Sequence, residues 1–503
     1  MSELVLAIDA GTTGVRSMLF APDGTVKARA YEEFESIFPR PSWVEQNADD
    51  WWNATCATID LCLQSSSTPC SRIAAVSVTN QRETVVPIGE NGRPLYNAIV
   101  WQDRRTVPQC EWIKEQIPDN DVYTITGLTV DPYFTAPKLL WLKEHEPVIY
   151  EDAHAFLLVH DYLVFCLTGT MTTDFSNASR TLLFDIEQAK WSKRMLDALE
   201  LPGEKLPTPV QSGTILGEVS SEASKVCGLE TGTPVVAGGG DQQCAALGVG
   251  VVHPGSLKST TGTGTFILAF SREKKLDASR RVLCSRHVVP NSFVIEASMF
   301  TTGSALRWFR DQLGSPEREI AEERGIDPYE VITECAADVP PGSEGIVHIP
   351  HFAGAGAPYW NPYARGIFAG LALGHTRHHL IRAILEGVSY EIKTNLDVMN
   401  DLGVAAREMR VTGGAARSET WMQIQADVVN KPVIRTEIEE ATALGAAMLA
   451  YLGIGIYDSL VETADCMVRP LTPLNPRDET RSIYDAGYTR YRTLYEAIKS
   501  IHW

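Results

Sequence analysis

The feature that most constrains the fold of this chain is a strand–turn–strand pattern that occurs twice. Near the N-terminus, an apolar run at 4–9 leads through a Gly/Thr turn at 10–14 into a second apolar run at 15–20. In the second half, the run at 256–260 leads through the Gly/Thr turn 261–264 into the run at 265–270. Glycine lets the backbone come close to a ligand, and successive N–H groups in such a turn form a concave anion site. One copy alone is typical of an ordinary hairpin, but a copy in each half predicts that one polyphosphate is held between two domains.

The first turn also carries an acid, because Asp9 ends the strand that precedes it. Magnesium prefers carboxylate oxygens and usually keeps several of its waters. A carboxylate in this position therefore predicts a water-mediated contact between Asp9 and Mg²⁺.

Length and charge limit the class of protein. A chain of 503 residues is too long for one core, so we expect two domains, at 1–250 and 251–503. The net charge of −19 argues against nucleic acid or an anionic membrane surface as a partner. No run approaches the roughly 18 consecutive apolar residues of a membrane span, and no signal peptide is evident at the N-terminus. We therefore expect a cytoplasmic protein without a membrane span.

The ten cysteines agree with a reducing compartment. None lies in a Cys-x-x-Cys pair, and Cys56, Cys62 and Cys166 fall in apolar stretches with helical character. We expect them to be reduced, buried and hydrophobic in role, rather than disulfides or zinc ligands.

Strands and helices alternate in both halves, which indicates the α/β class. Beyond the paired runs, we expect strands near 25–33, 73–78, 234–237 and 408–411, and helices near 48–64, 244–251, 302–313 and 377–400, from 419 onward, and at 441–450. Asn47 is the expected N-cap of the first helix. The Ala/Gly-rich helix at 441–450 is expected to pack closely.

Polar loops follow three of the predicted strands, at 81–83, 240–242 and 413–415. In open α/β sheets, ligands bind beyond the carboxyl ends of strands. Asp241 follows three glycines and precedes a helix, so either helix capping or catalysis would account for it. Capping would not account for the glycines. No Gly-x4-Gly-Lys-Ser/Thr motif is present, so an ATP site here would depend on turn amides rather than on a P-loop lysine.

Ordered motifs along nearly the whole chain carry a resemblance to a known family. They include Asp9-Ala-Gly-Thr-Thr13, Thr79-Asn-Gln-Arg-Glu-Thr84, Asn177-Ala-Ser-Arg-Thr181, Gly240-Asp-Gln-Gln243 and Ala441-Thr-Ala-Leu-Gly-Ala-Ala447. In these motifs the chain resembles the FGGY carbohydrate kinases, and most closely their glycerol-phosphorylating branch. The resemblance implies a two-domain actin/hexokinase-type (ribonuclease H-like) ATPase fold with a central cleft.

The resemblance also implies roles for individual residues, with Asp241 as the general base. It places the polyol against Arg82, Glu83, Trp101, Tyr133, Asp241, Gln242 and Phe266. It places ATP against Gly11, Thr12, Thr13, Arg16, Gly262, Thr263, Gly264, Gly303, Arg307, Gly413, Gly414, Ala415 and Ser418. Mg²⁺ would enter with ATP and meet Asp9, through water, and Asp241.

The implied reaction is in-line transfer of the ATP γ-phosphoryl group to glycerol, giving sn-glycerol 3-phosphate and ADP. An Arg–Glu pair suits a small triol, because it offers donors and acceptors to adjacent hydroxyls. Aromatic walls at Trp101, Tyr133 and Phe266 would shape the pocket and exclude water. We expect ATP or ADP and a small polyol as ligands, and a homodimer or homotetramer.

Other readings stay open at this point. One is a kinase of the same family for xylulose, ribulose or erythritol; others are an actin- or chaperone-like ATPase and a sugar-sensing regulator. The chain departs from the usual pattern of the glycerol branch at Ala10, Asp103, His160-Asp161-Tyr162 and Arg307. These positions are expected to lie around the substrate site and at the edge of the nucleotide site. They therefore affect whether glycerol is expected to be the only substrate.

Overall fold

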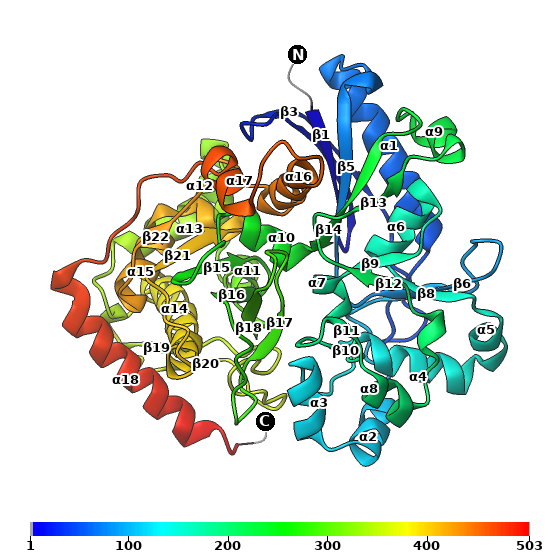
Figure 1. Ribbon diagram of the computed structural model, residues 1–503. Helices are drawn as coiled ribbons and strands as arrows, with labels where there is room; N and C mark the ends of the chain where they lie inside the picture. Colours follow the sequence, from blue (N-terminus) through cyan, green and yellow to red (C-terminus); the bar gives the residue numbers. More distant parts are fainter. Residues whose placement is uncertain (1–3, 502–503) are drawn as a thin grey trace.

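The computed structural model describes residues 4–501, so the outermost ends of the two predicted domains lie outside it (Figure 1). Two six-stranded mixed sheets form its framework. The first has the strand order β13 (Ile215–Glu218), β14 (Pro234–Gly240), β5 (Ile73–Asn80), β1 (Leu4–Ala10), β2 (Gly14–Phe20), β3 (Val26–Glu33). The second has the order β17 (Leu283–Arg286), β18 (Phe293–Met299), β16 (Thr265–Ser271), β15 (Ser256–Thr261), β21 (Glu408–Thr412), β22 (Val433–Ile434).

The two sheets repeat one topology. In the first, the antiparallel hairpin β1–β2 lies beside the parallel strands β5 and β14. In the second, the hairpin β15–β16 lies beside the parallel strands β21 and β22. Both predicted strand–turn–strand units are therefore confirmed, and each Gly/Thr turn joins the strands of its hairpin. This duplicated α/β architecture is the predicted two-domain fold.

Alternation along β1 gives the first sheet two apolar faces. Leu4, Leu6 and Ile8 pack in one core with α1 (Ala48–Ser66) and α6 (Val159–Thr168). Val5 and Ala7 pack in another with α10 (Asp241–Gly248) and α16 (Ala441–Gly453).

The helices α10 and α16 join the two halves of the chain, because α16 comes from the second half but packs on β1, β5 and β14 (Figure 1). Glycine makes the contact close: a Cβ on Gly248 would collide with the carbonyl oxygen of Ala441, and one on Gly445 with that of Cys244. The predicted close packing of this Ala/Gly-rich helix is confirmed.

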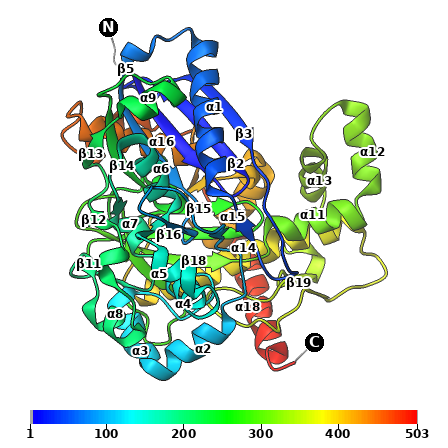
Figure 2. The same cartoon turned by 90° about the vertical axis from the view of Figure 1, so that its right-hand side faces the viewer.

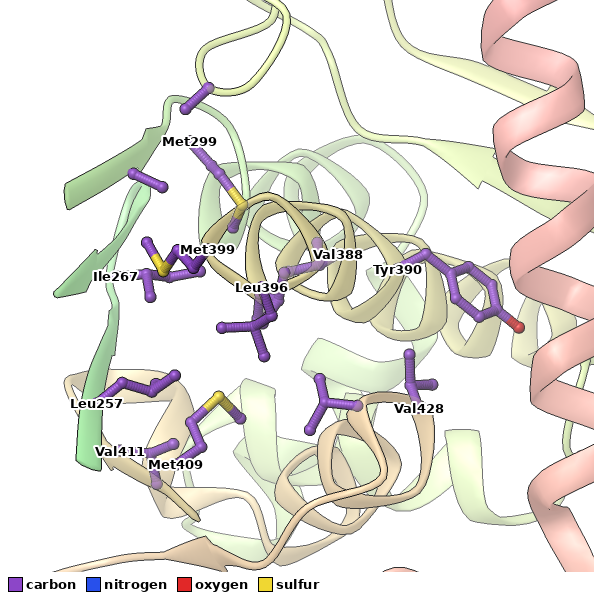
Figure 3. Packing of buried hydrophobic residues seen from close by; sticks show 14 of the residues in the cluster. Leu257, Ile267, Met299, Val388, Tyr390, Leu396, Met399, Met409, Val411 and Val428 are labelled. Carbon is purple, nitrogen blue, oxygen red and sulfur yellow. The ribbon is translucent and has the colours of Figure 1, made fainter. Parts of the chain in front are cut away.

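The second sheet packs against α14 (Arg377–Asp401) and α15 (Glu419–Val429). Figure 3 shows this core, in which Leu257, Ile267 and Met409 of the sheet face Leu396 and Met399 of α14. This packed layer supports β15 and β16, the two strands that the second Gly/Thr turn connects.

An inserted lobe lies mostly between β5 and β13 in the chain, a region whose structure the sequence left unassigned, and it also takes in β4, which precedes β5. Its centre is a four-stranded sheet in the order β4 (Glu45–Gln46), β7 (Ala98–Ile99), β6 (Val85–Ile88), β8 (Ala155–Leu158). Its helices are α2 (Val107–Gln116), α3 (Asp119–Thr126), α4 (Thr135–His145), α5 (Pro147–Asp152), α7 (Phe175–Ala178) and α8 (Lys193–Leu199).

The remaining elements are short strands and peripheral helices. The strands are β9 (Thr172–Asp174), β10 (Phe184–Asp185), β11 (Lys190–Trp191), β12 (Thr208–Val210), β19 (Val347–Ile349) and β20 (Ile367–Ala369). The helices are α9 (Ser221–Cys227), α11 (Gly303–Gln312), α12 (Ser315–Arg324), α13 (Pro328–Ala337), α17 (Leu460–Met467) and α18 (Arg481–Ile498). Among residues 4–501, no helix combines the length and apolarity needed to cross a bilayer.

Most of the predicted helices lie within a few residues of their expected ends, and Asn47 caps α1 by accepting a hydrogen bond from the N–H of Asp49. One expectation was wrong: the helix predicted at 244–251 begins at Asp241, and the three glycines before it belong to β14 rather than to a loop. A second expectation was wrong in part. Cys56 and Cys166 are only half-buried, although all ten cysteines are free.

Candidate active site

Three adjoining cavities line the cleft between the two Gly/Thr turns. The first, of about 440 Å³, receives walls from both turns. The second, of about 270 Å³, shares Gln242 and Thr260 with the first. The third, of about 460 Å³, shares Gly262 and Thr263 with the first and Gly414 with the second. The second turn thus stands where the first and third cavities meet, and the first turn lines the first cavity.

The first cavity is aromatic and is lined by four of the residues predicted for the polyol, whereas Arg82, Glu83 and Asp241 are not among its walls. Its walls include Trp101, Tyr133, Gln242 and Phe266, together with Thr12, Thr13, Gly262, Thr263 and Gly264 of the turns. The rings of Trp101 and Tyr133 meet edge to face at 5.5 Å, and the Trp101 Nε1–H donates to Thr12 Oγ1 at 3.0 Å. Phe134, Phe300 and Trp360 add three aromatic walls that sequence reasoning missed.

Arg82 and Glu83 are buried in an ion network that joins the two domains. Both terminal nitrogens of Arg82 donate to the Glu296 carboxylate, each at 2.9 Å. Arg180 Nε donates to Glu83 Oε1 at 2.5 Å, and Arg180 Nη1 donates to Glu296 Oε2 at 3.3 Å. The Arg82 Nε and Glu83 Oε1 atoms are 3.9 Å apart. The predicted pair therefore exists, but each member has its shortest contact with a residue to which the sequence gave no role.

The charges of this network depend on one another. Burial raises the pKa of Glu296, but Arg180 and Arg82 outweigh it and hold that pKa at about 2. Glu296 therefore stays ionised throughout the neutral range. A lone acid in the mostly apolar strand at 293–299 was the sequence signal for it, and Arg180 lay inside one of the quoted motifs.

Lys138 stabilises the backbone of Glu83, one member of this network. Glu83 has a left-handed backbone with φ of +65°, which is uncommon for a residue with a side chain. Its carbonyl oxygen accepts hydrogen bonds from Lys138 Nζ at 2.9 Å and from Thr135 Oγ1 at 3.2 Å. Lys138 Nζ also donates to the Tyr133 carbonyl oxygen at 2.9 Å. One buried lysine thus holds the backbone at two predicted substrate contacts.

Asp241 is the first residue of α10, and Gly240 is the N-cap, so the capping explanation of Asp241 is wrong. Its Oδ1 accepts from the Gln242 N–H at 2.7 Å and lies 3.3 Å from Arg82 Nε, and its Oδ2 accepts from Gln242 Nε2 at 3.1 Å. Lys258 Nζ donates to Gln242 Oε1 at 2.6 Å. The Asp241 side chain is 31% exposed, so a carboxylate in fixed orientation remains open to a ligand.

Close packing accounts for the three glycines before Asp241. A Cβ on Gly238 would collide with the carbonyl oxygen of Val78 in β5, and one on Gly239 with Val288. A Cβ on Gly240 would lie 2.5 Å from Arg82 Cδ. Any larger residue would displace the strand that presents Asp241, or Arg82 itself.

Asp9 is the next-to-last residue of β1 and lines the second cavity together with Arg16 and Gln242. Desolvation and the neighbouring Asp241 carboxylate raise the pKa of Asp9 to about 7, although Arg16 lowers it. Asp9 and Asp241 thus offer carboxylate oxygens close to one cavity, and these oxygens are hard donors, although Arg16 and Arg82 lie near them. Such a set fits hydrated Mg²⁺.

Internal hydrogen bonds fix the shape of both turns. In the first, Gln46 Nε2 donates to the Thr12 carbonyl oxygen at 2.7 Å, and the Gly11 N–H donates to the Gly14 carbonyl oxygen at 3.0 Å. The Gly11 amide is therefore already engaged, although it was predicted to contact ATP. In the second, the Ser304 N–H at the start of α11 donates to the Thr263 carbonyl oxygen at 3.0 Å.

The third cavity holds most of the remaining residues predicted for ATP. Gly303, Arg307, Gly414, Ala415 and Ser418 line it, while Arg16 and Gly413 line the second cavity. Further walls that sequence reasoning missed are Asp327, Tyr329, Glu330, Thr333 and Trp421.

Two α/β halves of like topology, each presenting a Gly/Thr turn to a shared cleft, define a two-domain kinase of the sugar-kinase type. The N-terminal domain model of the FGGY family of carbohydrate kinases matches residues 4–248, and the C-terminal domain model matches residues 257–454. The chain therefore belongs to the FGGY family of carbohydrate kinases.

Similar proteins of known name support the assignment to this family. The chain is 37% identical over 477 residues to the glycerol kinase of Janthinobacterium sp. (strain Marseille), covering 92% of each chain. It is 37% identical over 478 residues to that of Thermococcus kodakarensis, covering 92% of this chain and 91% of the relative. Among solved structures, the xylulose kinase from Rhodospirillum rubrum aligns with a TM-score of 0.91 at 28% identity over 99% of both chains. Plasmodium falciparum glycerol kinase with ADP aligns with a TM-score of 0.86 at 26% identity over 98% of both.

Proposed function

We propose that this protein transfers the γ-phosphoryl group of ATP to a terminal hydroxyl of glycerol, giving sn-glycerol 3-phosphate and ADP. The observation that carries the proposal is the first cavity. There, residues of both Gly/Thr turns, the aromatic walls and Gln242 meet around one space beside Asp241. The relatives named glycerol kinase, alike over about nine-tenths of the chain, support the same substrate.

In the proposed mechanism, Asp241 is the general base. Its carboxylate takes the proton of the attacking hydroxyl, the hydroxyl oxygen bonds to the γ-phosphorus in line, and the bond from that phosphorus to the ADP oxygen breaks. Gln242 and Arg82 orient the carboxylate through the contacts described above. A positioned base of this kind typically contributes ~10²–10⁴-fold in rate.

The two turns position the phosphates, and the aromatic walls keep water from competing with the polyol. Asp9 and Asp241 would hold a Mg²⁺ ion that arrives with the nucleotide. When bound, that ion supplies positive charge to the phosphate oxygens.

A second candidate substrate is a four- or five-carbon polyol or ketose, namely erythritol, xylulose or ribulose. The size of the first cavity, about 440 Å³, favours it, because a three-carbon triol alone fills only part of that space. Against it, six aromatic side chains narrow the cavity, and the γ-phosphoryl group itself needs room there.

The test is ADP release by the purified full chain with Mg-ATP, measured over glycerol, erythritol, D-xylulose and D-ribulose. Glycerol should give the highest kcat/KM, and the Asp241→Asn variant, measured in parallel, sets the background of ATP hydrolysis. Turnover with a pentulose but none above background with glycerol would refute the proposed substrate. We further propose a homodimer or homotetramer, which light scattering during size-exclusion chromatography would test.

A further inference from the structure

Outside the cleft, three different ligand types gather on neighbouring helices. Glu317 comes from α12, Cys335 from α13 and His378 from the start of α14. One ligand atom from each lies within 4.8 Å of the other two. An oxygen, a sulfur and an imidazole nitrogen are the donors that zinc-class ions take in proteins, often with three protein ligands and one water.

Glu317 is buried and has spare capacity to coordinate. Its carboxylate accepts from Arg377 at 3.1 Å through Oε1, while Oε2 has no hydrogen-bond partner among the described residues. The residue is 1% exposed, so water does not readily satisfy that oxygen. A buried carboxylate oxygen without a partner is costly, and a cation would satisfy it.

His378 gives the cluster a path to solvent. Its side chain is 35% exposed and lines an open surface hollow with His375 and Thr376. Its Nδ1 lies 3.4 Å from Asp338 Oδ2, which offers either a fourth ligand or a hydrogen bond that orients the ring.

We propose that Glu317, Cys335 and His378 bind one divalent transition-metal ion of the zinc class, with water or Asp338 completing four ligands. On binding, the Cys335 thiol releases its proton to solvent and the sulfur bonds to the metal as thiolate. Cys335 thereby departs from the general expectation that the cysteines of this chain act as small hydrophobes.

The position of the site gives it a consequence for the nucleotide end of the cleft. Tyr329, Glu330 and Thr333 of α13 line the third cavity, and Cys335 follows Thr333 by two residues, on the opposite side of the helix. Figure 2 shows α12 and α13 side by side at the edge of the molecule. A bound metal would tie α13 to α12 and α14, and so fix one wall of that cavity.

Co²⁺ titration of the chelator-treated full chain tests the site, because Co²⁺ bound to a thiolate absorbs in the near ultraviolet and a carboxylate site does not. We expect this band to saturate at one equivalent in the wild type, to disappear in Cys335→Ser, and to persist in Cys466→Ser, in which an exposed cysteine is replaced. Glu317→Gln, which keeps the shape of the side chain, should weaken Co²⁺ binding by at least about tenfold.

Zn²⁺ should also raise the thermal unfolding midpoint of the wild type and of Cys466→Ser, but not that of Cys335→Ser. This readout shows at the same time that the variants fold. Absence of a thiolate band in the wild type, or an equal band in Cys335→Ser, would overturn the proposal.

Discussion

At the polyol end of the cleft, four charged side chains are buried in mutual contact, whereas exposed side chains and glycine-rich backbone line the nucleotide end. Arg82, Glu83, Arg180 and Glu296 are each at most 2% exposed. At the other end, the side chains of Arg307 and Arg417 are 67% and 69% exposed. Buried charges that depend on one another thus lie behind one end of the cleft, and exposed charges line the other end.

This difference predicts where single substitutions should have the largest effect on activity. Removing one partner of a buried, hydrogen-bonded charge pair typically costs about 2–5 kcal/mol, because the other charge stays buried without a partner. An exposed ion pair is typically worth about 0–1 kcal/mol. Discrimination between substrates should therefore reside at the polyol end, and changes at the nucleotide end should be tolerated.

The largest effect is expected where the two ends meet, at Asp241. Asp241→Asn keeps the size of the side chain but removes the proton acceptor, so kcat should fall by about 10²–10⁴-fold with little change in glycerol affinity. Steady-state kinetics and a glycerol titration followed by calorimetry measure the two quantities. Near-normal kcat in a folded variant would exclude Asp241 as the base.

The next largest effect should come from Glu296, which lies on a strand of the second sheet. Glu296→Gln leaves Arg82 and Arg180 without their shared counter-charge, so kcat/KM for glycerol should fall by about 30- to 5,000-fold. KM for ATP should change far less. If kcat/KM for glycerol and KM for ATP changed by equal factors, the network would affect both ends of the cleft. That result would contradict the proposed difference between the two ends.

Glu296 also predicts a pH dependence of stability. Its pKa is about 2 in the folded protein, below its usual value of 4.5, so ionised Glu296 stabilises the fold above about pH 4.5. That contribution is lost as the pH falls from 4.5 toward 2. Urea unfolding should therefore show a smaller difference between wild type and Glu296→Gln at pH 3 than at pH 6. A difference that is independent of pH would contradict the assignment.

The smallest effect is expected at Arg307. Its guanidinium is exposed and lies 3.7 Å from Asp311, so Arg307→Ala should change KM for ATP by less than about fivefold. A larger change, measured by ADP release at saturating glycerol, would show that the nucleotide end also depends on a specific charge.

Features that depend on local pattern could be predicted from the sequence. Both hairpins follow from apolar runs on either side of Gly/Thr turns, and the start of α1 follows from Asn47. The cavity walls at Trp101, Tyr133 and Phe266 came from motif resemblance, and the structure places all three around one space.

Features that depend on distant pairing could not be predicted. Arg82 and Glu296 are 214 positions apart and meet only because the fold brings the loop after β5 beside β18. Glu83 adopts a left-handed backbone whose carbonyl is held by Lys138, and nothing in the residue types around 83 indicates that support. Helix capping was one explanation of Asp241 because it precedes a helix, and only the structure shows that the three glycines before it permit close packing within β14.

One measurement tests the division between the two ends most directly: glycerol kcat/KM and ATP affinity determined on the same Arg82→Ala variant, with thermal unfolding to confirm that it folds. The account predicts a loss of about 30- to 5,000-fold in kcat/KM for glycerol. It also predicts that ATP affinity without glycerol stays near that of the wild type, because the nucleotide cavities are lined by other residues. A loss below about fivefold for glycerol, or a parallel loss of ATP affinity, would contradict it.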